Sequence, residues 1–302
     1  MADVVAVPAL STPKAWLLAS RPRTLPVSIG PVAVGTAIAF AEDGLRWLPA
    51  FAALVGALLL QVGSNLANDL FDFEKGADGE GRIGPARATQ MGLLSATQMR
   101  AGMGVVFGAA VLVGVYLVWV GGWPVALVGS LSILAALAYT GGPWPFGYRG
   151  LGDFAVFLFF GVVAVVGTAY VQTLSFSGDA FAASLPVGAL ATAILVVNNA
   201  RDIESDAAAG KRTLAVRLGR AGARWEYRTL LFGPFMALPF YALAGAASWA
   251  VLAPCVLIPV AVRLERVVST STDGPALNEA LAGTARLALA FCLLFAAGWV
   301  LA

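Results

Sequence analysis

Long apolar stretches follow one another through almost the whole chain, separated by polar connections. Each is about 20 residues long, the length at which a helix crosses the hydrocarbon core of a bilayer. This repetition constrains the fold more than any other feature of the sequence. It predicts an all-α, polytopic membrane protein with about nine transmembrane helices, near residues 24–41, 48–70, 98–119, 124–140, 151–174, 184–201, 227–246, 248–265 and 282–301.

The composition excludes a soluble protein. Of 302 residues, 59% are hydrophobic and 12% are charged, whereas a soluble domain carries about 25% charged residues. We expect residues 1–302 to form a single transmembrane domain, with residues 1–20 as a polar N-terminal arm. Histidine is absent, which excludes a histidine base or metal ligand. Cys255 and Cys292 stand alone in apolar runs, without the spacing of a metal or redox motif.

The distribution of positive charge predicts how the spans are oriented. If the N-terminus is cytoplasmic, the connections after the second, fourth, sixth and eighth spans are cytoplasmic too, and they hold most lysines and arginines. Arg46 is the only basic residue expected on the opposite side, together with Glu42, Asp43 and Asp179. This bias agrees with the positive-inside rule.

Two polar motifs at the ends of apolar stretches share one spacing. Asn68 and Asp72 are four residues apart, and so are Asn198, Asp202 and Asp206. Residues at this spacing lie on one face of a helix, one turn above the other. Ionisable groups at membrane depth are costly and usually functional. We therefore expect a weak internal repeat that brings two helix ends together around one central cavity, on the cytoplasmic side.

The residue types in these motifs indicate a divalent cation and a phosphate. Mg²⁺ prefers a few carboxylate oxygens together with the oxygens of a substrate phosphate. A metal held in this way, with lysine and arginine beside it, stabilises the charge that grows on a diphosphate leaving group. The candidate metal ligands are Asn68, Asp72, Asn198, Asp202 and Asp206. The candidate diphosphate-binding residues are Lys75, Arg82, Arg201, Lys211 and Arg212, with Arg87 nearby.

An apolar cavity beside this polar end suits a polyprenyl diphosphate, whose tail would be reached from the membrane lipid. Tyr139 is either an anchor of the interfacial aromatic belt or a hydroxyl inside the cavity, and we favour the cavity. The candidate catalytic residues are Asp72, Asp202, Asp206, Lys211 and Tyr139. No nucleic-acid partner is expected.

Each assignment has a simpler structural interpretation. The carboxylates could be helix-end groups on a solvated face, although two matched clusters at span ends argue against this. The lysines and arginines of the loops could serve only to hold the orientation. Asp69 and Glu204 lie off the shared faces and are expected to be groups on a helix surface. Arg21 and Arg23 fit an orienting role better than a catalytic one.

The motifs resemble those of the UbiA superfamily of intramembrane prenyltransferases, and most closely its 1,4-dihydroxy-2-naphthoate polyprenyltransferase branch (MenA type). The resembling stretches cover about two-thirds of the chain: RPRTLP at 21–26, NLANDLFD at 65–72, KGAD at 75–78, GLLS at 92–95, YTGGPWPFGYRGLGD at 139–153, FFG at 159–161, NNARDIESD at 198–206 and GKRTLAVRLG at 210–219.

The resemblance implies a reaction. A Mg²⁺-bound diphosphate leaves, the allylic carbon becomes cation-like, and the naphthoate ring attacks it. Carbon dioxide is lost and demethylmenaquinone forms, as a step of menaquinone synthesis at the plasma membrane. The superfamily pattern would place an aspartate at Gly76; in the naphthoate branch Asp78 takes that role and becomes a further candidate metal ligand. Asp153 stands where this branch often has glutamate.

Three alternatives compete with this function. Another member of the superfamily would prenylate hydroxybenzoate, haem, chlorophyllide or a sugar phosphate. An ion-coupled transporter would also carry intramembrane carboxylates, but it would place them near the midplane rather than at span ends beside basic loops. A CDP-alcohol phosphotransferase is rejected, because Asp78-Gly79 and Ala86-Arg87 lack the two later aspartates of that pattern.

Overall fold

The computed structural model describes residues 11–76, 84, 87–245 and 247–301. Asp78 and Arg82, a candidate metal ligand and a candidate diphosphate-binding residue, lie outside the described residues. All regular structure within those ranges is helical. The helices are α1 (Thr12–Ser20), α2 (Pro26–Ala41), α3 (Trp47–Glu74), α4 (Ala96–Gly121), α5 (Trp123–Ala138), α6 (Gly152–Val156), α7 (Ala164–Thr173), α8 (Gly178–Arg201), α9 (Ile203–Ala208), α10 (Leu214–Leu243), α11 (Ile258–Thr270) and α12 (Gly274–Val300).

Shorter helical segments join several of these helices. A π-helical segment, Phe157–Val163, connects α6 to α7, and 3-10 turns occupy Pro22–Thr24, Phe146–Arg149 and Trp249–Leu257. Each of the nine predicted ranges therefore contains helix. By length and apolar composition, five helices of the described chain can cross a membrane: α3, α4, the stretch Gly152–Thr173, α8 and α12. Thr12–Thr24 and Pro26–Ala41, which meet at a bend of 51°, would make a sixth if they count as one span.

The remaining predicted spans depart from that composition for visible reasons. Helix α5 is apolar but only 16 residues long. Helices α10 and α11 carry several arginines and glutamates along their length. The total of nine spans stays a prediction.

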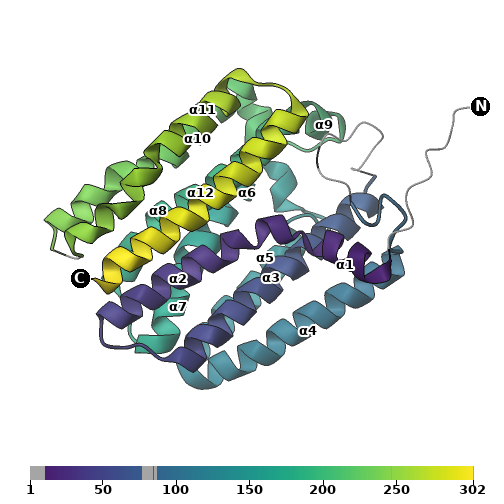
Figure 1. The fold of residues 1–302 in the computed structure, drawn as a ribbon. Coiled ribbons are helices and arrows are strands. Elements are labelled where there is room, and N and C mark those ends of the chain that lie inside the picture. The colour runs from purple at the N-terminus through teal and green to yellow at the C-terminus, as the bar shows by residue number, and fades with distance from the viewer. Residues whose placement is uncertain (1–10, 77–83, 85–86, 246, 302) are drawn as a thin grey trace, which may run out of the picture.

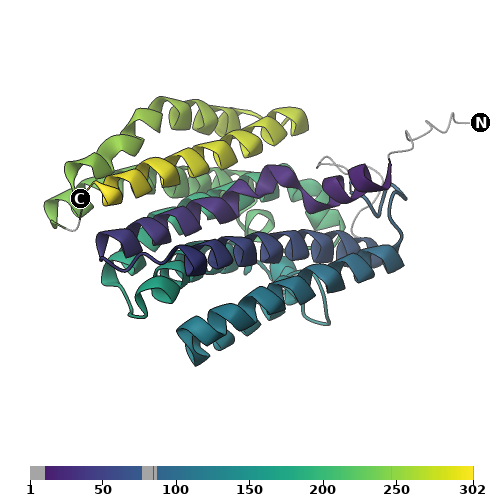
Figure 2. The same cartoon turned by 60° about the horizontal axis from the view of Figure 1, so that its bottom comes forward.

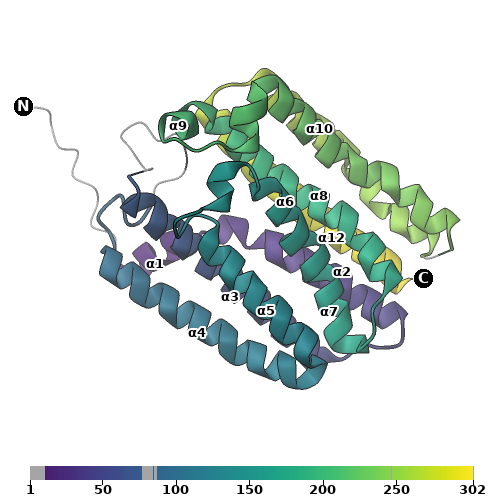
Figure 3. The same cartoon turned by 180° about the vertical axis from the view of Figure 1, so that it is seen from behind.

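The long helices run roughly side by side (Figures 1 and 2). Helix α12 packs against α2 and α8, α3 packs against α4, and α10 packs against α8. Helices α5, α6 and α7 lie behind α2 and α3 in Figure 1 and come forward when the molecule is seen from behind in Figure 3. Helices α1 and α9 lie toward the same end of the bundle, away from the C-terminus.

Local sequence signals set the ends of several helices. The Ser95 side chain accepts a hydrogen bond from the Gln98 backbone N–H, and the Gln98 side-chain oxygen accepts one from the Ser95 backbone N–H, a capping box that starts α4. Gly122, with φ 74°, separates α4 from α5. Asp273 caps the N-terminus of α12 by accepting a hydrogen bond from the Ala276 N–H.

The π-helical segment packs very closely against α8. A Cβ placed on Gly161 would lie 2.5 Å from the Cα of Gly188 and 2.9 Å from the carbonyl oxygen of Ser184. The two backbones touch because both facing residues are glycine.

Candidate active site

A cavity of about 980 Å³ runs into the bundle and is lined by residues from both polar motifs. Asn68 and Asp72 reach it from α3, and Asn198, Asp202 and Asp206 reach it from α8, the residue after α8, and α9. Most of the remaining wall is aliphatic or aromatic. In the described residues, helix ends from separate parts of the sequence thus line one cavity.

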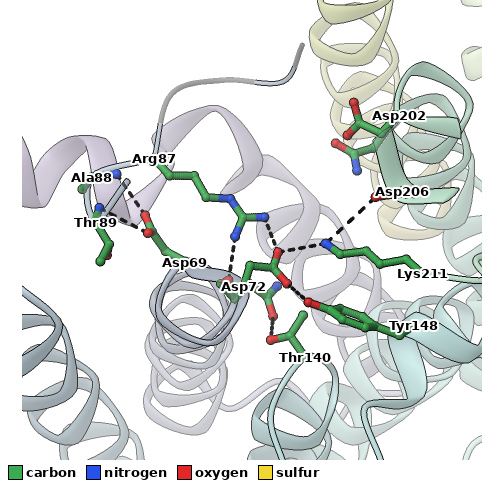
Figure 4. A network of polar contacts seen from close by, with 12 residues as sticks. Asp69, Asp72, Arg87, Ala88, Thr89, Thr140, Tyr148, Asp202, Asp206 and Lys211 are labelled. Carbon is green, nitrogen blue, oxygen red and sulfur yellow. Dashed lines mark hydrogen bonds and ion pairs between the residues drawn. The ribbon is translucent and has the colours of Figure 1, made fainter. Parts of the chain in front are cut away.

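Asp72 is the centre of the polar end (Figure 4). Its carboxylate is 2% exposed and forms an ion pair with Arg87. It also accepts a hydrogen bond from the hydroxyl of Tyr148 and another from Nζ of Lys211 at 3.2 Å. Two cations and a phenol therefore hold this one carboxylate in place.

Lys211 joins the two halves of the site. Besides Asp72, its Nζ lies 4.0 Å from Oδ1 of Asp206, so one ammonium group lies between a carboxylate of α3 and a carboxylate of α9. Lys211 is 9% exposed and lines the cavity. The predicted pairing of cations with both motifs is found here in a single side chain.

Tyr148 is a functional residue that we did not identify in the sequence. It lies in the turn Phe146–Arg149 and lines the cavity. Its ring is flanked by two ammonium groups, with Lys75 Nζ at 5.2 Å and Lys211 Nζ at 4.7 Å from the centroid. A tyrosine among many glycines and prolines reads as part of a turn, so its position beside Asp72 follows only from the folded chain.

Asn68 is held by residues around it. Its side-chain oxygen accepts a hydrogen bond from Thr140 Oγ1 at 2.9 Å, and its backbone carbonyl accepts one from Arg87 at 2.7 Å. Arg87 therefore contacts both the Asn68 backbone and the Asp72 carboxylate. This guanidinium stabilises the motif at the point where α3 ends.

The expectation that Asp69 is a group on the helix surface is wrong. Asp69 is 1% exposed, and its carboxylate accepts hydrogen bonds from the backbone N–H groups of Ala88 at 3.1 Å and Thr89 at 3.3 Å. It anchors the segment that carries Arg87. The helical period placed Asp69 correctly off the Asn68–Asp72 face, but the loop that folds back to cover it could not be read from that period.

The second motif does not lie on one uninterrupted helix. Helix α8 ends at Arg201 and α9 begins at Ile203, with Asp202 between them at φ −98° and ψ 12°. The four-residue hydrogen bonds continue across the break, from Asp202 N to Asn198 O at 3.2 Å and from Asp206 N to Asp202 O at 2.7 Å. Because those bonds persist, the motif still presents its polar side chains to the cavity.

Arg201 holds the side chains of this second motif in position. Its guanidinium bonds to the Asp202 carboxylate, to Asn198 Oδ1 at 2.9 Å and to Asn278 Oδ1 at 2.6 Å. Arg201 is 2% exposed and is not among the described residues that line the cavity. Asn278, on α12, was not singled out from the sequence, because a lone asparagine near a span end carries no signal of its own.

The other predicted residues lie at or near the cavity. Tyr139 lines it. Lys75 donates hydrogen bonds to the carbonyl oxygens of Thr140 at 2.6 Å and Gly142 at 3.3 Å, and partial desolvation lowers the pKa of its ammonium group. The backbone N–H of Arg212 donates to the Tyr148 carbonyl at 2.7 Å, and Arg212 is not among the described residues that line the cavity. Arg21, expected to serve orientation, lines the cavity instead.

Glu204 behaves as its position predicted. It is largely exposed and pairs with Arg220 at 2.6 Å, and this hydrogen bond lowers the pKa of its carboxyl group. It does not line the cavity among the described residues. The acidic residues of the second stretch thus divide into two that face the cavity and one that faces away.

The donor set fits magnesium by its chemistry. The carboxylates and carboxamides of Asp72, Asp202, Asp206, Asn68 and Asn198 all face one cavity, and hard oxygen donors of this kind suit Mg²⁺ when a substrate supplies the remaining oxygens. Within the part of the chain that the structure describes, no three acidic, histidine or cysteine side chains lie close enough to bind a metal alone. A substrate phosphate would have to complete the coordination.

The cavity wall also reaches the outside of the bundle. Val115 on α4 and Val128 on α5 line the cavity, yet they are 62% and 37% exposed. Phe176, which follows α7, is 71% exposed and lines it as well. The apolar part of the cavity is therefore continuous with the apolar surface between α4, α5 and α7.

Comparison with known proteins agrees with this geometry. The model of the UbiA prenyltransferase family matches residues 28–282. The chain is 39% identical to the 1,4-dihydroxy-2-naphthoate octaprenyltransferase of Escherichia coli, covering 96% of each chain. It is 38% identical to the protein of the same name from Mycobacterium tuberculosis, covering 92% of this chain and 94% of that one.

A solved structure supports the fold independently. The UbiA homologue of Archaeoglobus fulgidus, described as bound to GPP and Mg²⁺, superposes with a TM-score of 0.63 at 14% identity, covering 93% of this chain and 99% of the other. The relatives support a polyprenyl-transferring enzyme of menaquinone synthesis, and the apolar helices support a multi-pass membrane protein. With the family model matching most of its length, the chain belongs to the UbiA prenyltransferase family.

Proposed function

We propose that this protein transfers a polyprenyl group from a polyprenyl diphosphate to 1,4-dihydroxy-2-naphthoate, with loss of carbon dioxide and diphosphate, to give demethylmenaquinol, the two-electron reduced form of demethylmenaquinone. One observation carries the proposal: carboxylates from two separate motifs meet, through Lys211, at the polar end of a single apolar cavity. The names of the Escherichia coli and Mycobacterium tuberculosis relatives support the choice of acceptor.

The shape of the cavity suits the donor. Its polar end would take the diphosphate, and its aliphatic wall would take the prenyl tail. The basic loops support a cytoplasmic position for this polar end at the plasma membrane. The tail would then extend away from the cytoplasm, toward the exposed side of the cavity wall at Val115 and Val128, where lipid would lie.

Asn68, Asp72, Asn198, Asp202 and Asp206 are the residues that would hold Mg²⁺, with Asp78 as a further candidate. When bound, Mg²⁺ would neutralise charge on the departing diphosphate. Asp72 and Asp206 both pair with Lys211, which supports the proposal that the two sides of the site act on one ligand.

Arg87 and Lys211 have a second role in this proposal. Both pair with Asp72, and both line the cavity. A diphosphate carries several negative charges, so its arrival gives these two cations a stronger partner than a single carboxylate. Lys75, Arg82 and Arg212 are proposed to supplement them, while Arg201 holds Asn198 and Asp202 in position.

The acceptor would lie over the reacting end of the tail, near Tyr139. The phenol of Tyr139 borders the cavity close to the polar end and stacks edge-on against Phe146 at 5.4 Å between centroids. A flat aromatic acceptor fits beside such a ring. The hydroxyl of Tyr139 is then placed to contact a hydroxyl of the acceptor.

Turnover by purified protein in detergent tests this proposal. The assay contains 1,4-dihydroxy-2-naphthoate and a polyprenyl diphosphate, with and without Mg²⁺, and detects product by mass. We expect Mg²⁺-dependent formation of demethylmenaquinol, whose rate falls at least about 100-fold in Asp72→Ala and in Asp202→Ala, the scale of losing a group that stabilises transition-state charge. Glu204→Gln is the matched control, because Glu204 is next to the motif but faces away, and it should keep nearly full activity.

Prenylation of a different aromatic acceptor, with naphthoate inert, would move the protein to another branch of the family. Absence of diphosphate release with every acceptor, from protein that unfolds cooperatively, would contradict the proposed reaction.

A further inference from the structure

One buried carboxylate that is not part of the described cavity wall has no hydrogen-bond partner among the described residues. Asp153, at the start of α6, is 6% exposed, and neither of its side-chain oxygens has a hydrogen-bond partner. Among the described residues it forms no ion pair. Buried polar groups are nearly always paired, so an unpaired one calls for an explanation. The proposed roles of the two aspartate motifs do not use it.

The residue before Asp153 touches the hydroxyl of Tyr139. A Cβ on Gly152 would lie 2.7 Å from Tyr139 Oη, and a Cβ on Gly147 would lie 2.7 Å from the Cε1 of the same ring. The phenol is therefore held between two glycines, with Phe146 against its ring. Its hydroxyl is fixed one residue away from Asp153, and the Asp153 charge acts on it electrostatically.

A second carboxyl group lies within electrostatic range of Asp153. Glu226, on α10, has a buried Oε2 without a hydrogen-bond partner among the described residues. No described cation pairs with either carboxyl group. Tyr139 lines the cavity, whereas Asp153 and Glu226 are not among the described residues that line it.

We propose that Asp153 is the proton acceptor that activates the aromatic substrate through Tyr139. This inference rests on the proposed function, since it concerns the acceptor of the same cavity. Tyr139 is the group that touches the acceptor, and Asp153 acts through it. The role gives a reason for both the unpaired carboxylate and the tight glycine contacts around the phenol.

The proton transfers balance without another reagent. A ring hydroxyl of the acceptor gives its proton to Tyr139 Oη while the Tyr139 proton passes to an Asp153 oxygen. The electron pair stays on the acceptor oxygen and makes the ring more nucleophilic toward the allylic carbon. The carbon–carbon bond forms, the bond from that carbon to diphosphate breaks, and carbon dioxide leaves with its bonding pair returned to the ring. The proton then returns from Asp153 to the acceptor oxygen through Tyr139.

Several charged groups surround this path and bear on its pH dependence. Asp72 on α3 and Asp206 on α9 act on Tyr139 from the polar end, and Glu226 on α10 acts on Asp153. All are acidic, so they favour a protonated Tyr139 between turnovers. The relay therefore needs an acceptor such as Asp153 that is already ionised when the substrate binds.

Asp153→Asn tests the inference, because it keeps the size of the side chain and removes the base. General base catalysis contributes about 10²–10⁴-fold, so we expect kcat with naphthoate to fall at least about 100-fold at pH 7. The defect should shrink by about tenfold or more toward pH 9, because the acceptor hydroxyl then ionises in solution without help. A side chain with a merely structural role would give a loss that does not change with pH.

Asp153→Glu should restore activity, and Tyr139→Phe should repeat the pH-dependent loss while keeping the ring. Mg²⁺-dependent binding of a prenyl thiodiphosphate, which does not react, should be unchanged in all three variants. Near wild-type turnover of Asp153→Asn, or an equal loss at every pH, would overturn the inference. If Asp153→Asn does not fold, Tyr139→Phe decides by the same pH criterion. Inactivity of the wild-type protein with every aromatic acceptor would instead contradict the proposed function.

Discussion

Replacing Tyr148 by phenylalanine tests the geometry of the polar end most directly. The change removes the hydroxyl that donates to Asp72 and keeps the ring beside Lys75 and Lys211. A hydrogen bond to a charged group contributes about 1.5–3 kcal/mol. Since about 1.4 kcal/mol corresponds to tenfold in rate, Tyr148→Phe should lower kcat/KM by about 10- to 150-fold if the bond orients Asp72 for catalysis.

Tyr148→Ala separates the hydroxyl from the ring. It also removes two cation–π contacts, with ammonium groups at 5.2 Å and 4.7 Å from the centroid, each contributing about 0.5–1 kcal/mol. A further loss of about 5- to 30-fold is expected. The assay is turnover against Mg²⁺ concentration, where a loosened Asp72 should raise the concentration that gives half-maximal rate.

Tyr170→Phe is the matched control for this series. Tyr170 also lines the cavity, but its hydroxyl donates to the Gly121 carbonyl at 3.0 Å, and Gly121 belongs to neither motif. Its Mg²⁺ dependence should match the wild type. Wild-type kcat/KM and Mg²⁺ response in Tyr148→Phe would refute the reasoning, because they would mean that Asp72 needs no phenol to be positioned.

Two further predictions concern packing and the second motif. Gly161→Ala should lower the stability by about 1–3 kcal/mol, because the new methyl group would meet the Gly188 backbone; Gly104→Ala, with nothing within 4 Å, is its control, and equal thermal unfolding temperatures in detergent would contradict the close contact. Arg201→Lys should lower the stability by about 1–3 kcal/mol, because one ammonium cannot satisfy both Asp202 and Asn278 and leaves a buried polar group unpaired. A wild-type unfolding temperature would show that the guanidinium is dispensable.

The helices and the two motifs could be predicted because their signals are local. Apolar runs mark the helices, and four-residue spacing places Asn68 with Asp72 on one face. The basic loops pointed to cations near both motifs, and Lys211 occupies that position. These features depend on neighbours in the sequence or on averages over many residues, which a single chain displays.

The partners of the motifs depend instead on contacts between distant segments. Tyr148 reaches Asp72 across 76 positions and Asn278 reaches Arg201 across 77. Asp69 is buried because the chain folds back over it at Ala88 and Thr89. Neither the helical period nor the charge pattern contains that information. The break in the helix at Asp202 could not be predicted for a different reason. The four-residue hydrogen bonds on both sides of Asp202 are those of a continuous helix, so the four-residue spacing of the motif is the same with or without the break.

The exposed part of the cavity wall at Val115, Val128 and Phe176 has a thermodynamic consequence. The polar end and the apolar side of the cavity lead to two different phases. In the proposed reaction, the lipid-soluble product would leave by partitioning sideways into the bilayer, whereas diphosphate would leave into water. Once separated, the two products would rarely meet again in one cavity, so dilution into two solvents, rather than any group of the enzyme, would slow the reverse reaction.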